Sequence, residues 1–83
     1  MNDSIIKAHK YSKNNKDKLL MDSSCGCFYC CEIFNPTEIN EWVHDDNVTA
    51  LCPFCGIDSI IGEYSAFPIT KEFLTEMNKY WFL

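Results

Sequence analysis

The fold is decided by two cysteine-rich stretches: residues 25–31 read CGCFYCC, and residues 52–56 read CPFCG. Each stretch contains a Cys-x-x-Cys pair, and residues 31–51 separate the two pairs. A tight turn of this spacing brings two sulfur atoms to the same side, a tetrahedral edge apart. Two such pairs have the general form of a four-cysteine zinc site. We therefore predict one structural zinc ion, with the ligands Cys27, Cys30, Cys52 and Cys55.

The rest of the sequence favours a metal over disulfides. A chain of 83 residues often needs a metal, disulfides or a partner to stay folded. No apolar stretch approaches the roughly 18 residues of a membrane span, and residues 1–18 contain no apolar run suited to a signal peptide. We expect a cytoplasmic protein with no membrane contact. Thiols stay reduced there, and six cysteines then indicate metal ligands.

Two further cysteines, Cys25 and Cys31, flank the first predicted pair of ligands, and the chain contains two histidines, His9 and His44. Cys25 or Cys31 could replace its neighbour as a ligand, but adjacent cysteines cannot easily aim both sulfurs at one tetrahedral ion. We expect both to be small packing residues or free thiols. We expect His44 to cap the C-terminus of a helix, and His9 to lie on the surface.

Residues 1–44 predict helices on either side of the first cysteine stretch. Residues 1–22 should be partly helical, with Ser4 as a cap and a polar weakening at residues 12–16. Asn35, Pro36 and Glu38 form a capping box with proline at the first helical position. Phe34 and Ile39 match a hydrophobic staple. A short helix should follow, with Ile39, Trp42 and Val43 on one face, and should end in a polar turn at residues 44–47.

The second half of the chain predicts a hairpin and a closing helix. Residues 48–51 and 57–61 read as strands that pair around the second cysteine stretch. Pro68 and Thr70 open a last helix. Its predicted apolar face consists of Phe73, Met77, Tyr80 and Trp81, with Leu74 beside them.

Two cysteine turns, one followed by a helix and the other at the bend of a hairpin, resemble those of zinc-ribbon and treble-clef domains. Residues 52–56 also resemble the second iron-binding turn of rubredoxins. Cys30 is followed by Cys31 and not by glycine, however, and this departure favours zinc over iron. We expect a small α+β, zinc-ribbon or treble-clef-like domain with a cysteine β-hairpin and flanking helices. Residues 1–22 would form a partly helical, Lys-rich N-terminal segment, dispensable for the zinc fold, and residues 23–83 the zinc-binding domain.

A closer resemblance is to a group of small uncharacterised bacterial cytoplasmic proteins of this zinc-ribbon or treble-clef-like type. It rests on residues 25–30, 34, 36–39, 42, 49–59 and 67–82. The resemblance implies a bacterial, cytosolic origin and a zinc site, and it implies no activity.

Charge is distributed unevenly along the chain. In residues 1–20, five lysines against two aspartates give +3, whereas two lysines against ten acids give −8 in the remainder. There is no arginine, the residue that most often grips phosphate and guanine. This balance disfavours nucleic acid as a partner.

Enzyme classes fit the sequence poorly. A zinc deaminase needs a His-x-Glu motif and an open metal position, and four cysteines leave no position for water. Asp58 and Glu63 read as solvated acids. We therefore expect no enzyme, but a zinc-stabilised protein-interaction module, accessory or inhibitory, that binds one macromolecular partner of unknown identity. The alternative is a nucleic-acid-binding zinc ribbon that uses the Lys-rich N-terminus.

Overall fold

The computed structural model describes residues 3–44 and 48–82, which form a small α+β fold with two antiparallel sheets. The helical elements are α1 (Asp3–Ala8), η1 (His9–Ser12), α2 (Lys16–Leu19), η2 (Pro36–Glu38), η3 (Glu63–Ser65) and α3 (Lys71–Phe82), where η marks a 3-10 helix. The strands are β1 (Cys25–Cys27), β2 (Ile33–Phe34), β3 (Trp42–His44), β4 (Val48–Ala50) and β5 (Ile60–Gly62).

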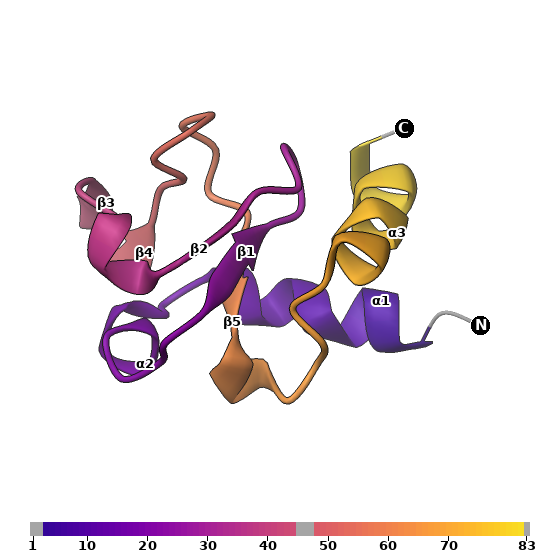
Figure 1. Cartoon of the computed structure of the whole chain (residues 1–83), viewed down its shortest axis with the longest axis horizontal. Helices are drawn as coiled ribbons and strands as arrows, with labels where there is room; N and C mark the ends of the chain where they lie inside the picture. Colours follow the sequence, from indigo (N-terminus) through magenta and orange to yellow (C-terminus); the bar gives the residue numbers. More distant parts are fainter. Residues whose placement is uncertain (1–2, 45–47, 83) are drawn as a thin grey trace.

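The larger sheet has the strand order β2-β1-β5, and both neighbouring pairs are antiparallel. Cys25 lies opposite Phe34 on one side and Gly62 on the other, and Cys27 lies opposite Ile60. The first cysteine turn therefore lies at the bend of the β1–β2 hairpin (Figure 1). We predicted a cysteine hairpin, but at the second turn.

The predicted pairing of residues 48–51 with residues 57–61 is wrong. β4 pairs with β3, and β5 crosses to pair with β1. Ile60 and Ile61 are both completely buried, and neighbouring strand residues point to opposite faces of a sheet. An isolated hairpin would expose one of these two side chains, whereas the three-stranded sheet is covered on both faces.

The capping box at Asn35 is confirmed. The Asn35 side chain accepts the N–H of Thr37 at 2.9 Å, and Glu38 accepts the N–H of Asn35 at 3.1 Å. Phe34 and Ile39, the predicted staple, are buried in the same apolar cluster. The sequence thus predicted how this turn begins.

The longer helix expected after this cap does not form, and that prediction is wrong. Ile39 is already extended, with φ −74° and ψ 124°. Trp42 then pairs with Ala50 in the smaller sheet, β3-β4. Helix nucleation is costly, and one cap is not enough to extend the helix. The next aromatic and β-branched residues, Trp42 and Val43, favour a strand and pair with β4 instead. His44 ends β3 and is exposed, so it caps no helix; residues 45–47 of the predicted turn lie outside the described residues.

The N-terminal segment is partly helical, as predicted, but Ser4 is not its cap. α1 already includes Asp3, which places Ser4 inside the first turn. The polar stretch at residues 12–16 does interrupt the helix, because η1 ends at Ser12 and α2 begins at Lys16.

The larger sheet separates two apolar clusters. Ile60 belongs to the cysteine-side cluster, together with Leu19, Cys25, Cys27, Phe34, Ile39, Ala50 and Cys52. Ile61 belongs to the helix-side cluster, together with Ile5, Ala8, Phe28, Leu74 and Met77. Figure 1 shows the same division: α1 and α3 cover one side of the sheet, and α2 with the β3-β4 sheet lies on the other.

The last helix is confirmed, with one change to its buried face. Leu74 and Met77 are completely buried, and Trp81 donates its indole N–H to the carbonyl oxygen of Ile5 at 3.3 Å. Tyr80, which we placed on the apolar face, is 53% exposed. The helix therefore turns its Leu74 side to the sheet.

Candidate metal centre

The two Cys-x-x-Cys turns have the same backbone conformation. We name residues 27–32 the first knuckle and residues 52–57 the second knuckle. In each, the fifth residue donates its N–H to the carbonyl of the first, at 2.8 and 2.9 Å. The first residue donates its N–H to the carbonyl of the sixth, at 3.0 Å in both. The two knuckles are thus closed by the same pair of backbone hydrogen bonds.

Both knuckles pass through the left-handed region at their fifth residue. Gly56 has φ 80° and Cys31 has φ 64°. We argued against iron because Cys31 stands where rubredoxin-like turns have glycine. Since Cys31 adopts the glycine-like conformation, the shape of the first knuckle does not exclude iron.

The knuckles bring the four predicted ligands together. The Sγ atoms of Cys27, Cys30, Cys52 and Cys55 all lie within 4.8 Å of one another. The Sγ atoms of Cys27 and Cys55 are 3.6 Å apart, and those of Cys30 and Cys52 are 3.7 Å apart. Zinc–sulfur bonds of about 2.3 Å imply tetrahedral edges of about 3.8 Å. The four sulfur atoms therefore fit a metal ion such as zinc.

Backbone N–H groups point at the sulfur atoms, as the turn geometry requires. Tyr29 donates its N–H to Cys27 Sγ at 3.3 Å, and Phe54 donates to Cys52 Sγ at 3.4 Å. The backbone N–H groups of Glu32 and Ile57 act to lower the pKa values of Cys30 and Cys55, against the effect of burial. Ser59, which is buried, lies with its Oγ 3.1 Å from Cys27 Sγ. These donors stabilise thiolate charge inside the fold.

The thiol pKa values reflect this environment. Burial raises the pKa of Cys55 to about 11 and raises that of Cys30 even further. Burial acts in the same direction on Cys27, but hydrogen bonds from Ser59 and from the N–H groups of Cys30 and Tyr29 outweigh it and lower the pKa of Cys27. Metal binding must displace the protons of all four thiols.

The two remaining cysteines lie outside this cluster. Cys25 is completely buried, its Sγ lies 3.5 Å from the carbonyl oxygen of Phe34, and burial raises its pKa to about 12. Cys31 is half-buried and packs on the helix-side cluster, with Thr75 Oγ1 3.9 Å from its Sγ. Both are free thiols.

Neither histidine belongs to the four-sulfur group. His44 is exposed at the end of β3. His9 is less exposed than we expected, because its ring centroid lies 4.0 Å from that of Trp81 and 5.7 Å from that of Phe28. Among the described residues, the only set of three or more metal-ligating side chains close enough to share an ion is the four cysteines.

Sequence reasoning missed Ser59. Its hydroxyl contacts Cys27, which is far away in sequence, and a lone serine before a buried strand carries no recognisable signal.

Asn15 was also missed, although its side chain connects the segments that carry the knuckles. Its side chain accepts the N–H of Ala50 at 3.0 Å and donates to the carbonyl oxygens of Ile60, at 3.0 Å, and Tyr11, at 3.2 Å. This one buried amide links the N-terminal segment to both sheets.

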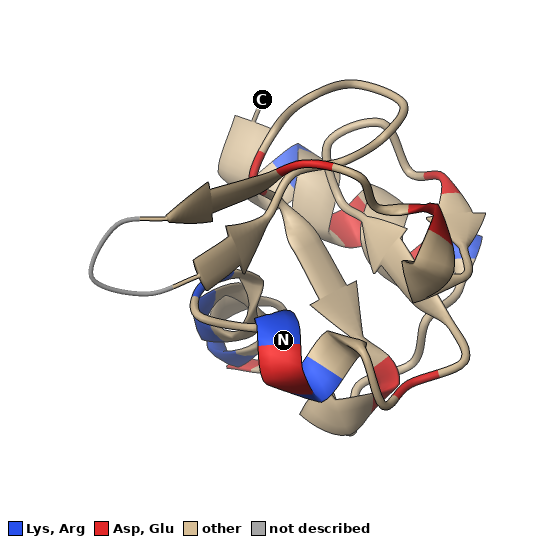
Figure 2. Cartoon of the chain, turned by 90° about the vertical axis from the view of Figure 1, so that its left-hand side faces the viewer, with Lys and Arg blue, Asp and Glu red and all other residues tan. Residues whose placement is uncertain are grey.

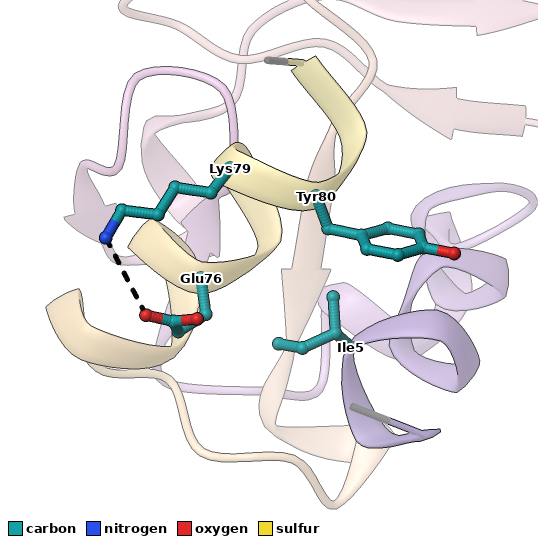
Figure 3. Close-up of a pocket in the computed structure, with 4 residues that line it drawn as sticks. All are labelled: Ile5, Glu76, Lys79 and Tyr80. Atoms are coloured by element: carbon teal, nitrogen blue, oxygen red, sulfur yellow. Dashed lines mark ion pairs between the residues drawn. The ribbon is translucent and has the colours of Figure 1, made fainter. Parts of the chain in front are cut away.

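A pocket outside the knuckles lies between α1 and α3 (Figure 3). Its lining residues are Ile5, Glu76, Lys79 and Tyr80. Glu76 and Lys79 form an ion pair at 3.9 Å, and both side chains are about 60% exposed. Substrate sites combine apolar walls with convergent, buried polar groups, and this pocket offers a solvated ion pair instead. Asp58 and Glu63, the two acids that we expected to be solvated, do not line this pocket. Asp58 is exposed, and Glu63 accepts hydrogen bonds from the N–H and hydroxyl of Ser23.

Comparisons with protein-family models, with curated proteins and with solved structures find no match. The zinc-ribbon and treble-clef resemblances and the expected bacterial origin therefore rest on the sequence alone. Every helix in the described part of the chain falls short of the length and apolar character that a membrane crossing requires.

Proposed function

We propose that this chain is a non-enzymatic protein-interaction module, stabilised by one structural zinc ion on Cys27, Cys30, Cys52 and Cys55. The observation that carries the proposal is the closed group of four sulfur atoms. Four thiolates fill a tetrahedral site, whereas catalytic zinc keeps one position for water or substrate. Zinc here would join the two knuckles and supply folding energy.

We propose further that the fold is of the zinc-ribbon type. Both pairs of ligands come from knuckles, and neither pair comes from the first turn of a helix. The bacterial cytoplasmic setting follows from the sequence resemblance. Zinc is favoured because a redox-inert ion suits a domain that the metal only stabilises.

Charge supports a protein partner over a nucleic acid. Residues 19–70 contain eight acids and neither lysine nor arginine. Figure 2 shows the consequence: lysines colour the N-terminal helices and α3, and none colours the sheets or knuckles. A divalent ion on four thiolates would add a further formal −2. Phosphate backbones are repelled by such a surface, and basic proteins are attracted.

The experiment is a capture from the cytosol of the native host, with the zinc-loaded full chain as bait. We expect one protein to be retained stoichiometrically and to be released by raised salt. The matched control bait replaces Glu32 and Asp58 with glutamine and asparagine, which keeps side-chain size and removes charge. If no protein is retained above the level of an unrelated zinc domain, the interaction-module proposal fails.

The rival function is nucleic-acid binding through the N-terminal lysines, of which Lys7, Lys10, Lys13 and Lys18 are exposed. Such binding releases counterions and weakens steeply with salt. We expect no binding of random DNA or RNA tighter than about 10⁻⁴ M at physiological salt, the weak end of the non-specific range. Micromolar binding that is lost when these four lysines become glutamine would favour the rival function.

A further inference from the structure

Each knuckle exposes an aromatic side chain at its third position. Tyr29 occupies this position in the first knuckle and is 46% exposed, and Phe54 occupies it in the second and is 56% exposed. Both knuckles and the C-terminal end of α3 lie at the same end of the molecule, at the top of Figure 1. That end of α3 adds Phe82, which is 41% exposed. We name this surface the aromatic tip: Tyr29, Phe54 and Phe82.

The metal centre does not explain these side chains. It uses only the backbone N–H groups of Tyr29 and Phe54, which donate to Cys27 and Cys52. Any residue except proline supplies such an N–H group. A polar side chain at either position would serve the knuckle equally well and would avoid exposing apolar surface to water. The metal centre therefore does not require an aromatic residue at the third position of either knuckle.

The aromatic tip is also held in place. Tyr29 packs edge-on against Phe82, with ring centroids 4.8 Å apart and planes at 84°. Phe54 packs against the buried Phe34 at 5.4 Å and 61°. The backbone of Tyr29 is fixed as well, since its carbonyl accepts the Asn78 side-chain amide at 2.8 Å. Rings fixed before binding lose little conformational entropy when a partner docks on them.

The charged residues that flank the knuckles in sequence are negative, and Lys79, three residues before Phe82 on α3, is paired with Glu76 at 3.9 Å. Glu32 is the sixth residue of the first knuckle, Asp58 directly follows the second, and both are exposed. The nearest lysines in sequence are Lys18 and Lys71, outside the segment that carries both knuckles. Aromatic faces and carboxylates together suit a guanidinium group, which stacks on rings and pairs with acids.

We propose that the aromatic tip is the docking surface for an arginine-bearing segment of the partner protein. This inference rests on the proposed function and names the contact surface and the chemistry of the partner. Guanidinium groups would stack on Tyr29 and Phe54, while Glu32 and Asp58 pair with the remaining charge.

The test uses the zinc-loaded full chain and a short peptide of alternating arginine and alanine. Binding is measured by calorimetry at low salt, and the contact surface is mapped by backbone amide shifts in NMR. We expect shifts in residues 28–32, 53–58 and 80–82. The double variant Tyr29→Ser, Phe54→Ser should fold and retain one metal ion, with a lower melting temperature because the ring contacts with Phe82 and Phe34 are lost, and should bind the peptide about tenfold or more weakly.

The matched control is the double variant Leu20→Ser, Met21→Ser. These residues are 56% and 84% exposed but follow α2, away from the aromatic tip. This variant should bind the peptide as the parent chain does. A second control peptide carries glutamate in place of arginine and should not bind. Peptide shifts confined to other residues, no peptide binding, or equal binding by both double variants would each overturn the proposal. Tighter binding of single-stranded RNA to the same rings would overturn it in favour of a nucleic-acid partner.

Failure of this inference is distinguishable from failure of the proposed function. If the partner captured from the cytosol binds the Tyr29→Ser, Phe54→Ser variant as well as the parent chain, the interaction module stands and the aromatic tip is not its contact surface. If no partner is captured, the proposed function itself fails.

Discussion

At the scale of single residues, the fifth positions of the knuckles differ in how well they suit their conformation. Gly56 adopts φ 80° without a side chain, whereas Cys31 holds φ 64° with one. A left-handed conformation costs an ordinary residue roughly 1–2 kcal/mol. The first knuckle therefore carries a backbone strain that the second avoids.

This difference predicts unequal responses to substitution at the two positions. A Cβ built at Gly56 meets no atom within 4 Å, so Gly56→Ala should lose only backbone energy, about 1 kcal/mol. Cys31→Gly should relieve strain and roughly offset the packing that it loses. Urea unfolding of the zinc-loaded variants measures both. A Cys31→Gly variant less stable than Gly56→Ala would contradict this account of the knuckles.

The side chain of Asn15 makes more hydrogen bonds than that of any other polar residue that we have described. It is completely buried, and its side chain makes three hydrogen bonds. Asn15→Ala would leave the Ala50 N–H and the Ile60 carbonyl without partners. An unsatisfied buried group costs about 1–3 kcal/mol, so we expect a loss of several kcal/mol.

The neighbouring Asn14→Gly is the control for this prediction. Asn14 is exposed and has φ 50°, a conformation that glycine adopts freely. Thermal unfolding should therefore find this variant close to the parent chain. Similar melting temperatures for the Asn15→Ala and Asn14→Gly variants would refute the assigned role of Asn15.

At the scale of elements, η1 is joined to α3 by the packing of His9 against Trp81. Burial, and to a lesser extent the charge of Lys13, lowers the pKa of His9, while Asp58 acts in the opposite direction. The unfolded chain then binds this proton more readily than the folded chain does. The resulting contribution to stability is present above about pH 6.5 and is lost as the pH falls through the lowered pKa of His9.

The expected outcome is a pH-dependent difference between the parent chain and His9→Gln. The free energy of unfolding of the parent chain should decrease from pH 7.5 to pH 5.5 by more than that of the variant. Taking the difference between the two proteins cancels the acid sensitivity of the thiolates, which both share. Parallel pH profiles would indicate that His9 titrates like a free imidazole.

Elements were predictable from sequence where the signal is local. The capping box at Asn35 and the closing helix depend on residues close to one another in the chain, and both are confirmed. The pairing of β5 with β1 depends on which strand offers a sheet covered on both faces, and no local pattern specifies that choice. The same reason explains why residues 42–44 form a strand and not the end of a helix.

At the scale of the whole molecule, the boundary expected at residue 22 is not a break in packing. Ile5 and Ala8 are buried in the helix-side cluster, and Leu19 is buried in the cysteine-side cluster. Tyr64 also donates its hydroxyl to the carbonyl oxygen of Tyr11 at 2.6 Å. The Lys-rich segment forms part of the core, and its lysines cover only its outer face.

Deletion of residues 1–18 should therefore destabilise the domain strongly, in contrast to our expectation from sequence. The deletion removes Ile5, Ala8 and the hydrogen bonds of Asn15, and core truncations of this kind cost several kcal/mol each. Circular dichroism and zinc retention measure the result. A truncated chain that melts at the temperature of the parent chain would show that the N-terminal segment is dispensable for the zinc fold, as we expected from the sequence.

The grouping of the four cysteines was predictable because the spacing within each knuckle is a local property and two knuckles need one ion. The supporting groups were not predictable. Ser59 contacts Cys27, and Asn15 contacts Ala50 and Ile60, all of which are distant from them in sequence. Each of the two appears in the sequence as an ordinary polar residue. The conformation of Cys31 was also hidden, because a non-glycine residue rarely adopts it.

The central claim is that one zinc ion joins both knuckles through four cysteine sulfur atoms. X-ray absorption at the metal edge of the purified full chain, with the metal content per chain, tests it most directly. We predict about one zinc per chain with four sulfur neighbours at about 2.3 Å, unchanged in Cys25→Ser and lost in Cys27→Ser. Iron in place of zinc, nitrogen or oxygen among the neighbours, or retention of the metal by Cys27→Ser but not by Cys25→Ser would contradict it.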